Sequence, residues 1–152
     1  MSIKIKRLSA YIKKTDIKEA TKEDILQASA IHINDVQKGC AFIADKIIDA
    51  GINHDRTKIL FNDNFFDESN QYIGVEEHLS RERHHSVHID NKCPEDVTLI
   101  DIIEYIVDVT MSATARKGRV SDAPISSEIL QKAYKNTFEM LKKEIIIEEE
   151  ND

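Results

Sequence analysis

The middle of the chain contains an apolar stretch of helical length at residues 98–114, which reads TLIDIIEYIVDVTMSAT. It holds no glycine or proline, the residues that most often interrupt a helix. Because apolar residues fall on most of its sides, we expect a central helix that its neighbours largely bury. Lys117-Gly118-Arg119 follows and is expected to end this helix.

Helical spacing also extends through the sequence before this stretch. Thr21 followed by Asp24 is typical of a helix start, in which the hydroxyl caps the first free amide groups. Apolar residues then recur at helical spacing as far as Gly51, which is the expected C-cap. Residues 4–14 are amphipathic but short, and predict an N-terminal helix or an arm packed on the body.

Three further segments complete the expected order of elements. Residues 59–71 predict a short helix and a loop, and residues 75–88 predict a second helical stretch. The sequence Asn91-Lys92-Cys93-Pro94 breaks that stretch. Ser126 or Ser127 is expected to cap a final amphipathic helix that continues to about Ile147.

The composition agrees with a helical fold throughout. The chain has 152 residues, of which 41% are hydrophobic and 32% charged, an ordinary balance for a soluble globular protein. Only four glycines and two prolines occur, which favours helices over a fold with many turns. We therefore expect one all-α domain over residues 1–152, with its core at about 21–147 and an acidic tail at 148–152.

The net charge restricts the partners that the chain can bind. A formal charge of −7 argues against tight binding to a nucleic-acid polymer. A small phosphorylated substrate remains compatible with it, because a bound metal ion reverses the local field. The sequence has no stretch of the length that crosses a membrane, and Cys40 and Cys93 are expected as reduced thiols of a cytoplasmic protein. A homodimer is left open.

All six histidines lie in the middle part of the chain: His32, His54, His78, His84, His85 and His88. Imidazole is the commonest metal ligand among side chains, and carboxylates complete sites for harder ions. His54-Asp55 directly follows the expected end of a helix, where its side chains can meet those of other helices. His32 lies on the apolar side of the preceding helix, where a histidine is either a hydrogen-bonded core residue or a buried ligand.

The histidine-rich run at residues 78–88 has a helical logic of its own. On a regular helix His78, Arg81, His85 and His88 form one stripe, with His84 to its side. Protonated imidazoles beside arginines would repel one another, whereas neutral imidazoles on a metal ion would not. The alternative is a solvated polar helix face, and which of these histidines are ligands stays open.

Three carboxylates follow one face of the expected central helix. A carboxylate in so apolar a helix is costly unless a cation or hydrogen-bond donors meet it. Asp108 lies deepest in the apolar run and is the preferred ligand. Glu104, one turn earlier, is expected to support a ligand or to act as a base, and Asp101 is expected on a solvated face.

These residues, in this order, resemble the HD superfamily of metal-dependent phosphohydrolases, whose pattern is His, then His-Asp, then a distant Asp. The closer resemblance is to a small HD-like family of unknown function, common in phages and bacteria, with HD-x-S-K, H-H and E-x-x-x-D motifs. The matching segments are His54-Asp-Arg-Thr-Lys58, Arg83-His84-His85 and Glu104-x-x-x-Asp108. Two departures are Thr57 in place of serine and Val109 where tryptophan is frequent.

The resemblance implies a divalent metal ion (Mn, Ni, Co, Fe, Zn or Mg) and hydrolysis of a nucleotide or another small phosphorylated metabolite. The implied ligands are His32, His54, Asp55, His84, His85 and Asp108. The implied catalytic residues are Asp55, Lys58, Arg83 and Glu104, with Lys58 and Arg83 binding the substrate phosphate and Arg81 supporting them.

Two other functions compete with this hypothesis. One is a helical binding or regulatory protein that keeps the HD scaffold without catalysis. The other is a pyrophosphohydrolase that uses carboxylates and magnesium. The abundance of imidazole among the candidate ligands disfavours the second, because magnesium prefers oxygen ligands.

Overall fold

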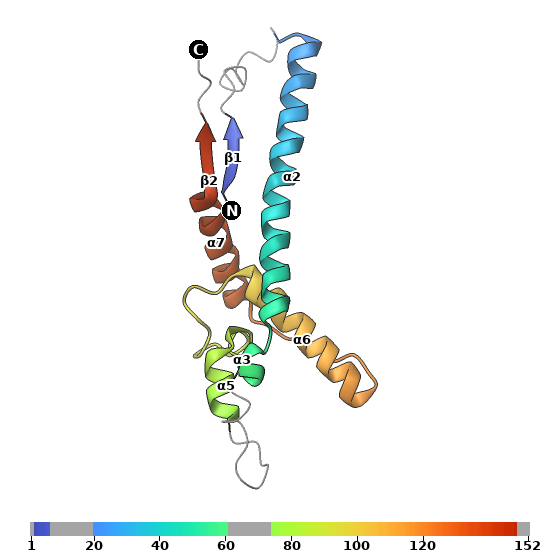
Figure 1. The fold of residues 1–152 in the computed structure, drawn as a ribbon, viewed down its shortest axis with the longest axis vertical. Coiled ribbons are helices and arrows are strands. Elements are labelled where there is room, and N and C mark those ends of the chain that lie inside the picture. Colours follow the sequence, from blue (N-terminus) through green and yellow to red (C-terminus); the bar gives the residue numbers. More distant parts are fainter. Residues whose placement is uncertain (1, 7–19, 61–73, 149–152) are drawn as a thin grey trace. The chain divides into compact units, whose positions relative to one another are not determined.

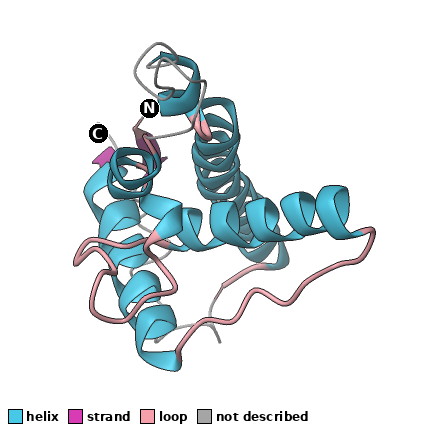
Figure 2. Cartoon of the chain, turned by 90° about the horizontal axis from the view of Figure 1, so that it is seen from below, coloured by secondary structure: helices cyan, strands magenta, loops and turns pink. Residues whose placement is uncertain are grey.

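The structure is a computed structural model that describes residues 2–6, 20–60 and 74–148. Helices make up most of this part of the chain, so the expected all-α class is confirmed (Figure 2). The helices are α2 (Lys22–Asn53), α3 (Arg56–Leu60), α5 (Val75–Arg81), the 3-10 turn η2 (Arg83–His85), α6 (Leu99–Lys117) and α7 (Ser127–Glu144). None of them is long and apolar enough to cross a membrane.

The chain divides into two compact units, which we describe separately. The first unit comprises residues 1–45 and 140–152, and the second comprises residues 46–139. In the first unit, the short strands β1 (Ile3–Lys6) and β2 (Ile145–Glu148) pair in parallel, with Ile3 opposite Ile145 (Figure 1). The final helix was expected to continue to about Ile147, and residues 4–14 were expected as a helix or as an arm packed on the body. The β-branched run Ile145–Ile147 instead favours an extended chain once a partner strand lies beside it.

The beginning of α2 is as the sequence predicts. The Thr21 hydroxyl accepts a hydrogen bond from the Asp24 amide at 3.1 Å, and the Asp24 carboxylate accepts from the Thr21 amide at 3.0 Å. This reciprocal pair satisfies amides that the helix itself leaves free. The helix ends two residues later than expected, because Gly51 is still helical. The chain turns at Asp55, whose φ of 52° lies in the left-handed region that Asp tolerates better than most residues.

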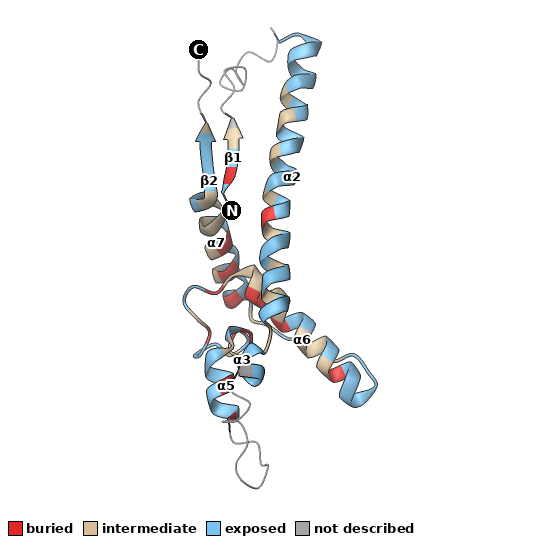
Figure 3. Ribbon diagram, in the orientation of Figure 1, coloured by how far each residue is buried: buried red, intermediate tan, exposed pale blue. Residues whose placement is uncertain are grey.

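The core of the second unit lies between α6, the first half of α7 and the loop before α6 (Figure 3). Its buried members are Val87, Cys93, Val97, Ile102, Tyr105, Ile129 and Ala133. Side chains of α7 anchor the loop: Asn136 donates to the Val97 carbonyl at 2.8 Å, and the Thr137 hydroxyl accepts from the Leu99 amide at 2.8 Å. The beginning of α6 and the loop before it are therefore fixed against α7.

Helix α6 confirms the central helix that opened the argument from the sequence. Thr98 and Asp101 form a capping box at its N-terminus, and Gly118 ends it with a φ of 65°. One side packs into the core through Ile102 and Tyr105, whereas Ile106, Val107 and Met111 are exposed among the described residues. The helix is thus half buried rather than covered on most sides.

The predicted helix over residues 75–88 is interrupted. α5 stops at Arg81, Glu82 adopts an extended conformation, and a single 3-10 turn follows. Tertiary contacts explain the break. The Glu82 carboxylate accepts a hydrogen bond from Thr57, and the Arg83 guanidinium donates one to Asp101. These contacts hold the side chains of Glu82 and Arg83 in directions that a continuous helix would not give them. The continuous stripe of histidines does not form.

Candidate metal centre

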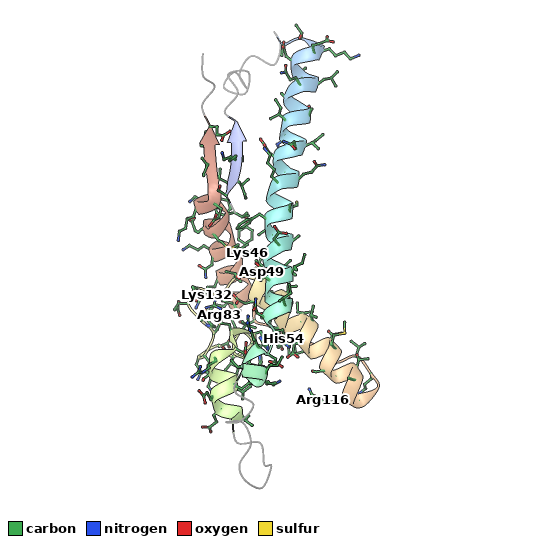
Figure 4. All side chains as sticks on the ribbon, viewed as in Figure 1. Lys46, Asp49, His54, Arg83, Arg116 and Lys132 are labelled. Atoms are coloured by element: carbon green, nitrogen blue, oxygen red, sulfur yellow. The ribbon has the colours of Figure 1, made fainter. Side chains whose placement is uncertain are left out.

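The residues after α2 begin the site, within the second unit. His54 lies directly after the end of α2, and Arg83 lies in η2 (Figure 4). The chain turns out of the helical conformation at Asp55, and the side chains of His54 and Asp55 contact Glu104 of α6 and His84 of η2. The left-handed turn therefore positions the His-Asp pair that the sequence singled out.

The Asp55 carboxylate is the centre of the cluster. Ring nitrogen Nε2 of His78 lies 3.1 Å from its Oδ1, that of His85 lies 3.4 Å from it, and that of His84 lies 3.6 Å from it. His54 Nε2 lies 3.6 Å from the other carboxylate oxygen. Four imidazoles thus direct the same nitrogen, Nε2, toward one carboxylate.

A second carboxylate completes the cluster from α6. Asp108 Oδ1 lies 3.5 Å from His54 Nε2. Three overlapping groups could each hold a metal ion: His54 with Asp55 and His84, Asp55 with His78 and His85, and His84 with His85 and Asp108. Five of the six predicted ligands are therefore brought together.

The remaining predicted ligand, His32, is not part of the cluster. It lies far from the end of α2, in the first unit, and its side chain is exposed. The groups of described residues that could hold a metal ion do not include His32, and its ligand role stays a prediction.

His78 supplies the fourth imidazole of the cluster, whereas His88 lies outside the cluster. His78 is only 3% exposed and its Nε2 lies 2.8 Å from that of His85. His88 is exposed and its ring stacks on Tyr105, with centroids 4.8 Å apart. The sequence left both open. Seven positions separate His78 from His85, which would place them on one side of a helix, but only the fold shows that they meet.

Outer hydrogen bonds fix the direction of the imidazole rings. Glu104 Oε1 accepts from Nδ1 of His54 and from Nδ1 of His84, each at 3.0 Å. A carboxylate oxygen only accepts, so each of these rings carries a proton on Nδ1 and points Nε2 inward. Glu104 is therefore a positioning residue, which agrees with one of the two roles expected for it.

The charges of the cluster shift the pKa values of its members. Burial lowers the pKa values of His78 and His85, which favours their neutral, metal-binding form. Burial also acts to lower the pKa of His84, but the hydrogen bond and charge of Glu104 outweigh it and raise that pKa. The pKa of Glu104 is lowered, because its bonds to His84 and His54 outweigh the burial that would raise it.

Two buried polar atoms in the cluster have no hydrogen-bond partner among the described residues, Asp55 Oδ1 and His84 Nε2. An unsatisfied buried carboxylate oxygen or imidazole nitrogen is costly, and native proteins rarely keep one without a function. Both atoms face the centre of the cluster and both are metal-ligand atoms in type. The donor set therefore fits a divalent cation.

The two predicted phosphate-binding residues have different surroundings. Lys58 Nζ forms an ion pair with Asp55 and its side chain is 45% exposed, so it lies at the cluster and remains accessible. Arg83 instead binds Asp101 Oδ1 at 2.9 Å and Asp96 Oδ1 at 3.0 Å. Because its guanidinium is already held by two carboxylates, Arg83 connects η2 to the start of α6.

Asp101, expected on a solvated face, is buried at 8% exposed. Burial acts to raise its pKa, but hydrogen bonds from Arg83 and from Thr98 outweigh burial and lower it. Because the pKa of Asp101 is lower in the folded state than its ordinary value of 3.8, ionised Asp101 stabilises the protein at pH values above 3.8. This stabilisation is lost as pH falls through the folded pKa.

We therefore expect Asp101→Asn to lower the free energy of unfolding at neutral pH by about 2 kcal/mol, through the lost charged hydrogen bonds and cap. As pH falls below 3.8 and then through the lowered folded pKa of Asp101, the two proteins should converge, because Asp101 becomes protonated in the folded protein as well. Denaturant unfolding across this pH range measures the difference. Asp90→Asn, at an exposed carboxylate of the same unit, is the matched control. An equal loss at every pH would contradict the electrostatic explanation.

Comparisons of the chain with models of protein families, with curated proteins and with solved structures found no match.

Proposed function

We propose that the second unit binds a divalent transition-metal ion and hydrolyses a nucleotide or another small phosphorylated metabolite. The observation that carries this proposal is the convergence of four Nε2 atoms on Asp55, with Asp55 Oδ1 and His84 Nε2 lacking a hydrogen-bond partner in the described part of the chain. Imidazole-rich sites suit Mn, Fe, Co, Ni or Zn better than Mg. The order of the motifs, which resembles that of HD phosphohydrolases, adds the class of reaction.

The proposed ligands are drawn from His54, Asp55, His78, His84, His85 and Asp108. A metal ion held there would lower the pKa of a coordinated water and polarise a phosphoryl oxygen. Glu104 holds the rings of His54 and His84 through their Nδ1 atoms, which directs Nε2 of each ring toward the proposed ion. Lys58 pairs with Asp55 of the cluster while its side chain stays 45% exposed, and we assign to it the phosphate contact.

A non-catalytic binding protein is the second candidate, and one contact favours it. Lys58 Nζ already neutralises Asp55, so the cluster can persist without an ion. The two candidates differ in one respect that is simple to measure. A phosphohydrolase needs the ion and the two ligand carboxylates for turnover, whereas a binding protein has no turnover to lose.

The test is a screen of nucleoside monophosphates and p-nitrophenyl phosphate with Mn, Co, Ni, Zn or Mg added, after metal analysis of the purified protein. We expect release of phosphate with at least one transition metal, and its loss in a variant carrying both His54→Ala and Asp108→Ala. His88→Ala, at an exposed ring outside the cluster, should stay active. Activity that survives the double substitution would rule out this site as the catalyst.

A further inference from the structure

A short chain of hydrogen bonds runs from Glu82 through Thr57 to His78. The Thr57 hydroxyl lies 2.6 Å from Glu82 Oε1 and 2.8 Å from His78 Nδ1. The same Glu82 oxygen accepts from the Thr57 backbone amide at 3.1 Å. The three residues come from α3, α5 and the residue after α5, so the chain exists only in the folded unit.

The donors in this chain can be assigned from elementary chemistry. A carboxylate oxygen only accepts, so the single hydroxyl proton of Thr57 is donated to Glu82. The Thr57 oxygen then has only a lone pair to offer to His78, so His78 Nδ1 carries the proton that is donated. In a neutral imidazole the other nitrogen is then bare. His78 therefore presents the lone pair of Nε2.

That lone pair faces the centre of the cluster. His78 Nε2 lies 3.1 Å from Asp55 Oδ1 and 2.8 Å from His85 Nε2. Two acceptors as close as a bare imidazole nitrogen and a carboxylate oxygen repel each other unless a proton or a cation lies between them. His85 Nε2 can donate a proton to the bare His78 Nε2 at 2.8 Å, and a metal ion bound at the centre would offset the repulsion between His78 Nε2 and Asp55 Oδ1.

We propose that Thr57, oriented by Glu82, is a positioning residue that fixes the protonation of the buried His78 ring on Nδ1 and so makes Nε2 a metal ligand. This inference rests on the proposed metal site and explains how one of its four imidazoles, His78, comes to present Nε2 to the ion. It also gives the hydroxyl at position 57 a task that either serine or threonine can perform. Valine has almost the same shape as threonine and cannot perform it.

The experiment compares wild type, Thr57→Val and Thr57→Ser. Binding of Co²⁺ and Zn²⁺ is measured by calorimetry, and ¹⁵N NMR of the metal-free protein reports which nitrogen of His78 carries the proton. We expect Thr57→Val to weaken metal binding by roughly 10- to 100-fold, the usual cost of losing an outer hydrogen bond to a ligand, and to shift protonation of His78 toward Nε2. Thr57→Ser should bind as wild type does and retain Nδ1 protonation.

Measurements on the metal-free protein distinguish the positioning role of the Thr57 hydroxyl from a purely structural one. If Thr57→Val only weakens folding, its unfolding midpoint falls while the metal affinity of the folded protein and the protonation of His78 stay unchanged, which overturns the inference. If wild type binds metal and Thr57→Val binds it with equal affinity, this inference is overturned and the proposed function is not. Wild type that binds no divalent ion overturns the proposed function and this inference with it.

Discussion

Asp55→Asn is expected to abolish the stabilisation of the protein by divalent metal ions. All four imidazole Nε2 atoms of the cluster approach this carboxylate, at 3.1 to 3.6 Å. Asparagine keeps its size but not its charge, and an amide is a much weaker ligand for a cation. The loss of affinity should therefore exceed the roughly 10- to 100-fold that an outer hydrogen bond is worth.

This substitution is well matched to its position in the backbone. Asp55 has a φ of 52°, and asparagine is among the few residues that adopt this conformation readily. Asp55→Asn therefore changes the charge with little added backbone strain, which Asp55→Ala would not achieve. Any change in metal binding can be assigned to the lost charge rather than to a lost turn.

Thermal unfolding with increasing metal concentration measures the effect. For wild type, a metal concentration of about 100 times Kd should add roughly 2.7 kcal/mol to the free energy of unfolding, and a chelator should remove it. Asp55→Asn should show no such gain at the same concentration. Asp90→Asn, at an exposed carboxylate of the same unit, should behave as wild type does. A metal-dependent gain that persists in Asp55→Asn would show that the ion binds elsewhere.

Removing Glu104 is expected to have the second largest effect, because one carboxylate orients two rings. Its Oε1 accepts from both His54 and His84, so Glu104→Ala frees both rings to rotate. We expect metal affinity to fall by about 100-fold, the upper end for an outer hydrogen bond. Glu104→Gln keeps a carbonyl oxygen that can still accept, and should lose less. Calorimetric titration with Zn²⁺ or Co²⁺ ranks the variants, and equal affinity of all three proteins would contradict the role assigned to Glu104.

The same pair predicts a pH signature in the metal-free protein. The pKa of His84 is raised above its ordinary 6.5, so its contribution to stability is complete below 6.5 and is lost as pH rises through the folded pKa. The pKa of Glu104 is lowered below its ordinary 4.5, so its contribution is present above 4.5 and is lost at lower pH. The difference in unfolding free energy between wild type and Glu104→Gln should therefore be largest between pH 4.5 and 6.5.

Burial of His78 and His85 acts in the opposite direction. Their pKa values are lowered, so their burial reduces stability as pH falls below the ordinary value of 6.5. This contribution is common to wild type and Glu104→Gln, so the comparison between the two proteins isolates the Glu104 pair. A difference that does not change with pH would show that the pair contributes shape and not charge.

Much of the candidate site could be predicted from the order of the residues along the chain. His54-Asp55 follows a long periodic helix, and Glu104 and Asp108 lie one turn apart in an apolar helix, where a carboxylate without a partner is costly. Residues one turn apart share a helix face whatever the rest of the fold does. For this reason Glu104 and Asp108 both reach the cluster.

The described site differs from the expectation where local pattern and tertiary contact disagree. His32 has the spacing of a ligand, but spacing does not reveal whether the chain turns back between two histidines, and α2 does not. Arg83 was expected to bind the substrate phosphate, and in the structure its Nε lies 2.9 Å from Oδ1 of the buried Asp101. Neither the path of α2 nor the contact between Arg83 and Asp101 can be read from neighbouring residues, because each depends on positions far apart in the sequence.

By itself, the sequence determined the helical class, the central helix with both of its ends, and the residue types from which a metal site could be built. These follow from periodicity, caps and composition, which act over a few neighbouring residues. Only the tertiary structure decided which imidazoles meet. The bonds of Glu82 to Thr57 and of Arg83 to Asp101 pull residues 82–85 out of the helix that their spacing favours, and this break turns His84 and His85 toward Asp55.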